Sequence, residues 1–298
     1  MTNLQTLEPV TGQKAKIVIE QSLDLAHQHY ENFPVASVFL PKHLREPIGL
    51  IYSFARQADD FADEGDLTLE SRLDLLNSFR DELDLLHAYI KPQTPFFATL
   101  GDMIGAKKLS FEPFYDLLNA FSQDVIKTRY DNYKEVLDYC SRSANPIGRL
   151  LLELYGESSP EKIQHADNIC SALQLINFLQ DIAIDFKKND GKQRIYMCQN
   201  EMARFNITEQ QIATQMVDIN WQRFMQFNLK RVSIMLQAGK PLGRILKGRI
   251  GFEMRAIIAG GERIIHKIDR VNGDIFNRRP TLNKWDWMVI LTKALFKI

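Results

Sequence analysis

The chain has 298 residues, of which 45% are hydrophobic and 25% are charged, as in ordinary globular proteins of one large domain or two. Lys plus Arg and Asp plus Glu both number 37, so the net charge is zero. This balance argues against nucleic acid as a partner, because nucleic acid is bound largely through clustered basic residues. Cys140, Cys170 and Cys198 have neither zinc-ligand nor disulfide spacing, so we expect small buried thiols.

Apolar residues recur at helical spacing along nearly the whole chain, most clearly over residues 44–62, 69–86 and 169–183. No alternating run of Val, Ile or Thr bounded by turns marks a strand. Breaks between helices are expected at Pro41, 92–95, Pro113, 156–160, 189–191, 239–243 and 272–274. None of these breaks is long or polar enough for a linker. The sequence therefore predicts one all-α domain over residues 1–298, with about ten or more helices.

The first acidic motif lies near the end of the helix predicted over residues 44–62, where five acids fall within residues 59–66. Residues at i, i+4, i+7 and i+11 share one face of a helix. The polar stripe so defined consists of Tyr52, Arg56, Asp59 and Asp63, with Asp60 and Glu64 one position on. A single stripe of this kind is most often a solvated helix face.

The second acidic motif repeats the pattern on the helix predicted over residues 169–183. Its polar positions are Gln174, Asn177, Asp181 and Asp185. The residues around them are apolar nearly all round, so we expect this helix to be buried. Burying carboxylates without partners costs many kcal/mol or forces their protonation. Asp181 and Asp185 therefore require either Arg or Lys partners or metal ions.

The donor atoms of the two motifs are oxygens, which suit Mg²⁺ or Ca²⁺ rather than zinc. Mg²⁺ in proteins commonly binds one or two carboxylates together with waters and substrate phosphates. Two facing helices that each offer Asp-x-x-x-Asp would cradle a Mg²⁺–diphosphate unit. The two motifs together predict a metal-dependent diphosphate site.

At these residues the chain resembles the squalene/phytoene synthase family of head-to-head prenyl transferases, over nearly its whole length. The segments that carry the resemblance are "HYENFPVASVFLP" (29–41), "YSFARQADDFADE" (52–64), "YCSRSANPIGRLLLELYG" (139–156) and "ALQLINFLQDIAIDFKKNDGKQRIYM" (172–197). The resemblance implies a single-domain helical bundle of the isoprenoid synthase type, with a central cavity for an isoprenoid diphosphate.

The resemblance also implies the roles of individual residues. The implied Mg²⁺ ligands are Asp59, Asp60, Asp63, Asn177, Asp181 and Asp185. The implied catalytic residues are Asp59, Asp63, Asp181, Asp185 and Tyr139. The implied contacts to the substrate are His29, Asn32, Tyr52, Arg56, Gln174, Asn177, Arg194 and Tyr196. Aromatic candidates for a dry cavity around a carbocation are Phe33, Tyr52, Phe54, Tyr139 and Phe178.

Several details resemble the branch of the family that makes hydroxysqualene in the hopanoid pathway, among them the tail over residues 260–287. Family members more often carry Arg where this chain has Gln180, which removes a cation beside the predicted metal ligands. The favoured hypothesis is therefore ionisation of presqualene diphosphate, rearrangement and capture of water. No NADPH is expected, since no GxGxxG follows a predicted strand. Two alternatives remain open: condensation of two prenyl diphosphates to presqualene diphosphate or phytoene, and a non-catalytic scaffold subunit.

The last residues, 282–298, combine two Trp, several aliphatic residues and three Lys. They fit either an interfacial membrane helix or a helix that closes the domain. The basic stretch 276–280 fits contact with anionic lipid or with solvent. The first residues have no signal-peptide pattern, and no apolar run reaches the roughly 18 residues of a membrane span. We expect a cytoplasmic protein, with peripheral contact to the inner membrane surface and association with other squalene-pathway enzymes both open.

Overall fold

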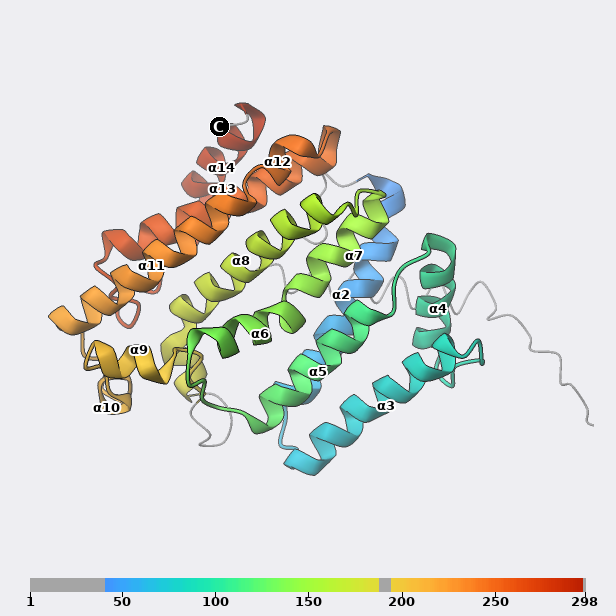
Figure 1. Cartoon of the computed structure of the whole chain (residues 1–298), viewed down its shortest axis with the longest axis horizontal. Helices are drawn as coiled ribbons and strands as arrows, with labels where there is room; N and C mark the ends of the chain where they lie inside the picture. The colour runs from blue at the N-terminus through green and yellow to red at the C-terminus, as the bar shows by residue number, and fades with distance from the viewer. Residues whose placement is uncertain (1–40, 188–193, 297–298) are drawn as a thin grey trace, which may run out of the picture. The chain divides into compact units, whose positions relative to one another are not determined.

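Residues 41–187 and 194–296 are described by the structure, a computed structural model, and they are helical almost throughout (Figure 1). These residues form thirteen helices and no strand; an isolated parallel bridge joins Tyr130 to Cys198. The all-α prediction is confirmed. The described residues group into two compact units, 41–125 with 153–156, and 126–152 with 157–187 and 194–296. The single domain over residues 1–298 stays a prediction.

The first unit is built on four helices, α2 (Lys42–Asp63), α3 (Leu69–His87), α4 (Pro95–Lys107) and α5 (Glu112–Ile126). Phenylalanine rings fill the space between them. The centroid of the Phe54 ring lies 5.1 Å from that of Phe114 and 5.6 Å from that of Phe79. Phe54 is fully buried in this contact, so the structure gives this cavity candidate a core role.

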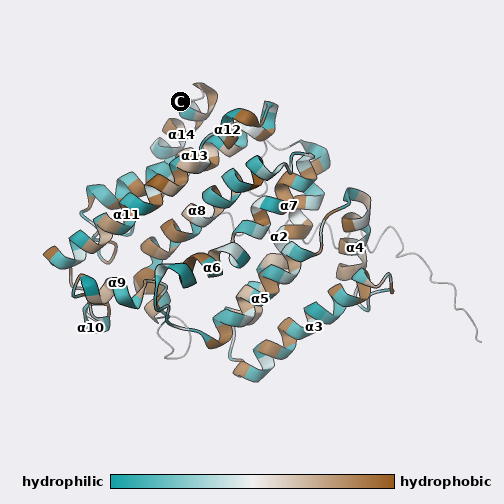
Figure 2. Cartoon of the chain, in the orientation of Figure 1, coloured by the Kyte–Doolittle hydropathy of each residue, from teal (hydrophilic) through white to brown (hydrophobic). Residues whose placement is uncertain are grey.

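The second unit contains the remaining helices. Their bounds are α6 (Tyr133–Ser143), α7 (Asn145–Tyr155), α8 (Pro160–Lys187), α9 (Gln199–Arg204), α10 (Glu209–Ala213), α11 (Ile219–Gly239), α12 (Leu242–Ile245), α13 (Gly248–Arg270) and α14 (Lys284–Phe296). The last turn of α7 groups with the first unit. In Figure 2, hydrophobic and hydrophilic bands alternate along the helices, as expected when each helix buries one face.

Helix α8 is the core of the second unit, because α6, α11 and α13 all pack against it. Glycine permits the closest approaches. A Cβ on Gly239 of α11 would lie 2.5 Å from Ile169 Cγ1 and 2.8 Å from the His165 carbonyl oxygen of α8. The expectation of a buried helix is confirmed by residues such as Leu175, Phe178 and Leu179, all 5% exposed or less.

Helix α8 also corrects one expectation from the sequence. By length and composition it is apolar enough to cross a membrane, alone among the helices described. The same property is typical of the core helix of a soluble protein, and 56% of the most apolar stretch of α8 is buried. Since three helices cover α8, we interpret it as a core helix.

Helix α14 packs against α13 (Figure 1). Ile290 and Ala294 lie in an apolar cluster with Ala256 and Ala259 of α13. This packing agrees with a closing helix, one of the two alternatives expected for the tail. The three cysteines are buried free thiols, also as expected.

Candidate functional site

The first acidic motif occupies the last two turns of α2. The Arg56 guanidinium lies 2.6 Å from the Asp60 carboxylate and 3.5 Å from that of Asp59, as spacings of four and three residues allow. It also lies 3.9 Å from Glu64, just beyond the helix. Asp63 is half-buried on the same helix. The predicted substrate contact Arg56 is thus the first counter-ion of the predicted metal ligands.

The position of this motif is electrostatically unfavourable. The C-terminal end of a helix carries a partial negative charge, which repels nearby carboxylates. Asp59, Asp60 and Asp63 all lie at this end of α2, and its last turn contains no basic residue. Arg56 offsets part of this repulsion, and a cation bound at these carboxylates would offset it further.

Arg72 of α3 holds the end of α2 and was missed in the sequence. Its guanidinium donates hydrogen bonds to the carbonyl oxygens of Phe61 at 3.1 Å, Glu64 at 2.9 Å and Gly65 at 2.7 Å. The side chain is only 5% exposed. A signal was present, since Arg72 interrupts the apolar stripe of its helix, in phase with Leu76. Gly65 has a φ of +73°, which favours glycine at this turn.

Tyr52 lies on α2, seven residues before Asp59. Burial raises the pKa of its hydroxyl; Arg56 lowers it, whereas the carboxylates of Asp59 and Asp60 raise it further. The pKa is raised overall, so Tyr52 keeps its proton at neutral pH and can donate a hydrogen bond.

The second acidic motif lies in the last three turns of α8, and a residue from far along the chain neutralises it. The Arg279 guanidinium contacts the Asp181 carboxylate at 2.7 Å. One residue earlier, the Gln180 side-chain amide donates to the Pro280 carbonyl oxygen at 2.7 Å. Arg279 belongs to the basic stretch that was expected to face lipid or solvent; its side chain is 36% exposed, so it contacts Asp181 while it stays open to solvent. Arg279 brings to Asp181 the positive charge that Gln180 does not carry.

Asn177, one turn before Asp181, carries the clearest sign of a ligand. Its side-chain oxygen Oδ1 is buried and accepts no hydrogen bond from any part of the chain that the structure describes. An unsatisfied buried oxygen costs roughly 1–3 kcal/mol, so a native structure rarely keeps one without a reason. Coordination to a cation would satisfy this oxygen.

The two motifs fit Mg²⁺ by the chemistry of their donors. Both offer oxygens as ligands, the first lies at the negative end of its helix, and Asn177 Oδ1 has no hydrogen-bond partner among the described residues. Asp185 and Gln174 are half-buried on α8, on the face predicted for them. Within residues 41–187 and 194–296, no three His, Cys, Asp or Glu side chains already form a metal-binding group. The motifs belong to separate units, so their facing arrangement stays a prediction.

Aromatic rings gather beside the second motif. The Phe178 and Tyr196 rings stack with centroids 3.8 Å apart and planes 6° from parallel. Tyr139 lies 5.5 Å from Tyr196 and 6.0 Å from Phe178. The structure therefore brings together three of the predicted site residues. It adds Tyr130, which is fully buried, lies 5.6 Å from Tyr196 and has no distinct signal in the sequence.

Arg194 adds a cation to this aromatic group. Its Nη1 donates a hydrogen bond to the Tyr196 hydroxyl at 3.1 Å, and its guanidinium lies 5.7 Å from the centre of that ring. Arg194 is 4% exposed. A buried guanidinium beside tyrosine hydroxyls is suited to bind an anion such as a phosphate.

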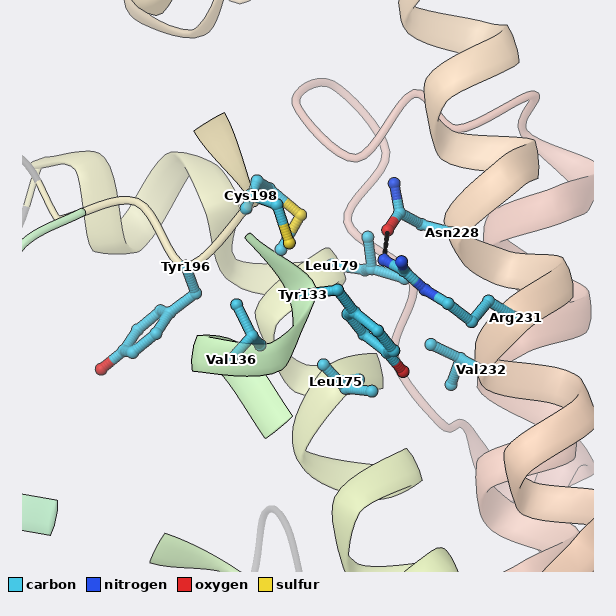
Figure 3. A pocket seen from close by; sticks show the side chains of 10 residues that line it. Tyr133, Val136, Leu175, Leu179, Tyr196, Cys198, Asn228, Arg231 and Val232 are labelled. Atoms are coloured by element: carbon cyan, nitrogen blue, oxygen red, sulfur yellow. Dashed lines mark hydrogen bonds between the residues drawn. The ribbon is translucent and has the colours of Figure 1, made fainter. Parts of the chain in front are cut away.

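A small pocket lies behind Tyr196 (Figure 3). The Arg231 guanidinium lies 3.5 Å from the centre of the Tyr133 ring and donates to the Asn228 side-chain oxygen at 2.6 Å. The pocket has a volume of about 10 Å³, which has room for one water-sized molecule. An isoprenoid chain cannot enter it, so we assign this pocket no part in substrate binding.

The candidates His29, Asn32 and Phe33 lie outside the described residues.

Comparison with known proteins gives this geometry a context. Residues 26–286 match the family model described as squalene/phytoene synthase. Hydroxysqualene synthase of Rhodopseudomonas palustris is 32% identical over 240 residues, which cover 80% of this chain and 79% of that protein. The 15-cis-phytoene synthase of Synechococcus elongatus is 25% identical over 290 residues, which cover 93% and 92%.

Among solved structures, the squalene synthase HpnC from Alicyclobacillus acidocaldarius superposes with a TM-score of 0.77 at 30% sequence identity. The match covers 88% of this chain and 97% of that one. The isoprenoid synthase type of helical fold, expected from the sequence, is thereby confirmed.

Proposed function

The chain belongs to the squalene/phytoene synthase family of isoprenoid synthases, which act on isoprenoid diphosphates, and we propose that it is a hydroxysqualene synthase. The proposed substrate is presqualene diphosphate. Its products are hydroxysqualene and diphosphate. The similarity to a hydroxysqualene synthase over four fifths of the chain supports this product.

The observation that carries the diphosphate chemistry is the buried side-chain oxygen of Asn177, which has no hydrogen-bond partner among the described residues and lies one turn before Asp181 on α8. We assign Mg²⁺ to the oxygens of Asp59, Asp60, Asp63, Asn177, Asp181 and Asp185. When bound there, Mg²⁺ stabilises the charge that develops on the leaving diphosphate.

The basic and hydroxyl side chains bind the diphosphate. Arg194 is buried, and its fork of N–H donors can hold two phosphate oxygens at once. Tyr196 shares a hydrogen bond with Arg194, so its hydroxyl lies beside this proposed phosphate contact, and Tyr52 stays protonated and can act as a donor. Arg56 keeps the first motif from excess negative charge before substrate arrives.

The reaction balances with water alone. The bond between carbon and the diphosphate oxygen breaks, and the electron pair leaves with diphosphate. The cyclopropyl carbinyl cation rearranges, a water oxygen bonds to the cationic carbon, and the water loses a proton. The faces of Tyr139, Phe178 and Tyr196 stabilise positive charge and exclude further water. No reductant is consumed, so the proposal requires no NADPH.

A second candidate function is the head-to-head condensation of two prenyl diphosphates. Gln180 argued against it, because this residue removes a cation beside the second motif. The contact of Arg279 with Asp181 weakens that argument, since the cation is supplied from another segment. Similarity to a phytoene synthase over 93% of the chain is consistent with this candidate.

A product assay separates the candidates. The purified protein receives presqualene diphosphate or farnesyl diphosphate, each with Mg²⁺ and without NADPH. We expect hydroxysqualene from the first and no product from the second. Consumption of farnesyl diphosphate would move the activity to condensation. Squalene formed only after addition of NADPH would contradict water capture, and no turnover of any substrate would favour the scaffold alternative.

A further inference from the structure

Helix α14 has two apolar faces. One faces α13, where Asp286, Ile290 and Ala294 are 1% exposed or less. The other is exposed and consists of Trp285 (74%), Met288 (59%), Val289 (41%), Leu295 (65%) and Phe296 (66%). These five residues recur at the spacing of one helix face and are called the outer face of α14.

The outer face concentrates exposed apolar surface. Fourteen large hydrophobic residues are exposed in the described part of the chain, and five of them lie on this one helix of 13 residues. Scattered exposed apolar residues are ordinary, whereas a contiguous group marks an interaction site. The inner face already secures α14 to α13, so packing within the unit does not account for the outer face.

The charges on α14 indicate the kind of partner. Its one acid, Asp286, is buried and paired with Arg263 at 2.6 Å and with Lys267. The helix therefore presents no exposed carboxylate. Its remaining charges are those of Lys284, which is exposed, and Lys293, which is 41% exposed and contacts Glu262. Exposed Arg278 lies just before the helix in the chain.

We propose that the outer face of α14 inserts into the surface of an anionic lipid bilayer. An apolar face with Trp, bordered by lysines and without acids, is the pattern of a helix that lies in the membrane interface. A symmetric contact between two copies would instead bring the same basic border together, which like-charge repulsion opposes. The proposal concerns the surface and stands whichever isoprenoid product the enzyme makes.

The test is co-sedimentation of the full chain with vesicles. One set contains phosphatidylcholine with phosphatidylglycerol in equal parts, and the other phosphatidylcholine alone. We expect binding to the anionic set that falls with salt. The variant W285S/L295S/F296S should lose at least about tenfold in partition, since it lacks three apolar side chains that the bilayer would bury. Lys284→Gln should weaken binding by about fivefold.

A matched control removes three exposed apolar side chains elsewhere in the second unit. The variant I126S/I219S/I234S replaces residues that are 69%, 57% and 63% exposed. It should bind vesicles as the wild type does. All six replaced side chains are exposed, so both variants should keep the wild-type melting temperature. Emission of Trp285 should shift to shorter wavelength on anionic vesicles, and the shift should be lost in Trp285→Phe.

Three results would overturn the proposal. The wild type could fail to bind anionic vesicles, or the α14 variant could bind as tightly as the control. Alternatively, light scattering could show a dimer in solution that the α14 variant dissociates, which would assign the outer face to a second copy. Turnover of detergent-dispersed substrate by the α14 variant separates this proposal from the proposed function, because catalysis needs no bilayer under those conditions.

Discussion

The two acidic motifs are neutralised in different ways. In α2, the cation comes from the same helix, since Arg56 lies three and four residues before Asp59 and Asp60. In α8, the cation comes from Arg279, 98 residues after Asp181. The first motif is thus a local device, which its own helix supports. The second depends on the chain between α13 and α14, so any change that loosens this segment changes the charge around Asp181.

The largest expected effect comes from the second motif itself. Asp181→Ala should lower turnover of presqualene diphosphate by at least about a thousandfold, because a ligand of the leaving-group cation is lost. Asp138→Ala is the control, since this carboxylate is 64% exposed and contacts Arg142. Steady-state kinetics and circular dichroism make the measurement. Equal activity of the two variants would remove Asp181 from the reaction.

The stability of the end of α2 should depend most strongly on Arg72. Arg72→Met removes three charge-assisted hydrogen bonds to the carbonyl oxygens of Phe61, Glu64 and Gly65 and leaves the end of α2 without this donor. We expect a loss of about 2–4 kcal/mol in the free energy of unfolding, measured by urea denaturation. Arg80→Met provides the comparison, because its one hydrogen bond, to Asn119, is exposed. A loss no larger than that of Arg80→Met would contradict the role of Arg72.

As the pH falls, helix α14 should lose stability at a pH at which the end of α2 is still intact. Burial raises the pKa of Asp286, but hydrogen bonds from Lys267, the Asn283 amide and Arg263 outweigh it and hold the pKa at about 2. An unfolded Asp titrates near 3.9. The lowered folded pKa therefore contributes stability above about pH 4, on the order of 2 kcal/mol, which is lost as the pH falls towards 2.

Hydrogen exchange followed by mass spectrometry measures this effect region by region. Exchange in α14 should rise between pH 4 and 2, after correction for the intrinsic rate, and Asp286→Asn should raise it at neutral pH. Exchange at the end of α2 should not follow Asp286→Asn. An equal response would mean that the end of α2 and helix α14 do not open independently.

The smallest expected effect compares the two counter-ions directly. Arg279→Gln should cost about 0.5–1 kcal/mol without metal, because the ion pair is partly exposed, and should raise hydrogen exchange over residues 276–283. In this variant the guanidinium no longer competes with Mg²⁺ for Asp181, so calorimetry should show tighter Mg²⁺ binding. Arg56→Gln should leave exchange in that segment unchanged. Unchanged exchange in both variants would show that Arg279 does not tie the segment to α8.

The contrast between the motifs also explains what the sequence could predict. Helical periodicity over residues 44–62 matched α2, at Lys42–Asp63, and the stripe that joins Arg56 to Asp59 follows from spacing alone. The contact of Arg279 with Asp181 has no such periodic signal, because only tertiary packing brings the two segments together. For the same reason Tyr130 and the role of Arg72 were missed.

The carboxylates at the ends of α2 and α8 lower the stability of the metal-free fold, but the proposed reaction requires them. Repulsion between the negative end of each helix and Asp63 or Asp185 costs stability in the metal-free fold, which the contacts of these two carboxylates offset only in part. Selection for thermal stability alone would therefore replace charged residues in these motifs. A laboratory search for heat-resistant descendants of this chain should encounter such substitutions early, and each would need to be checked for turnover before it is kept.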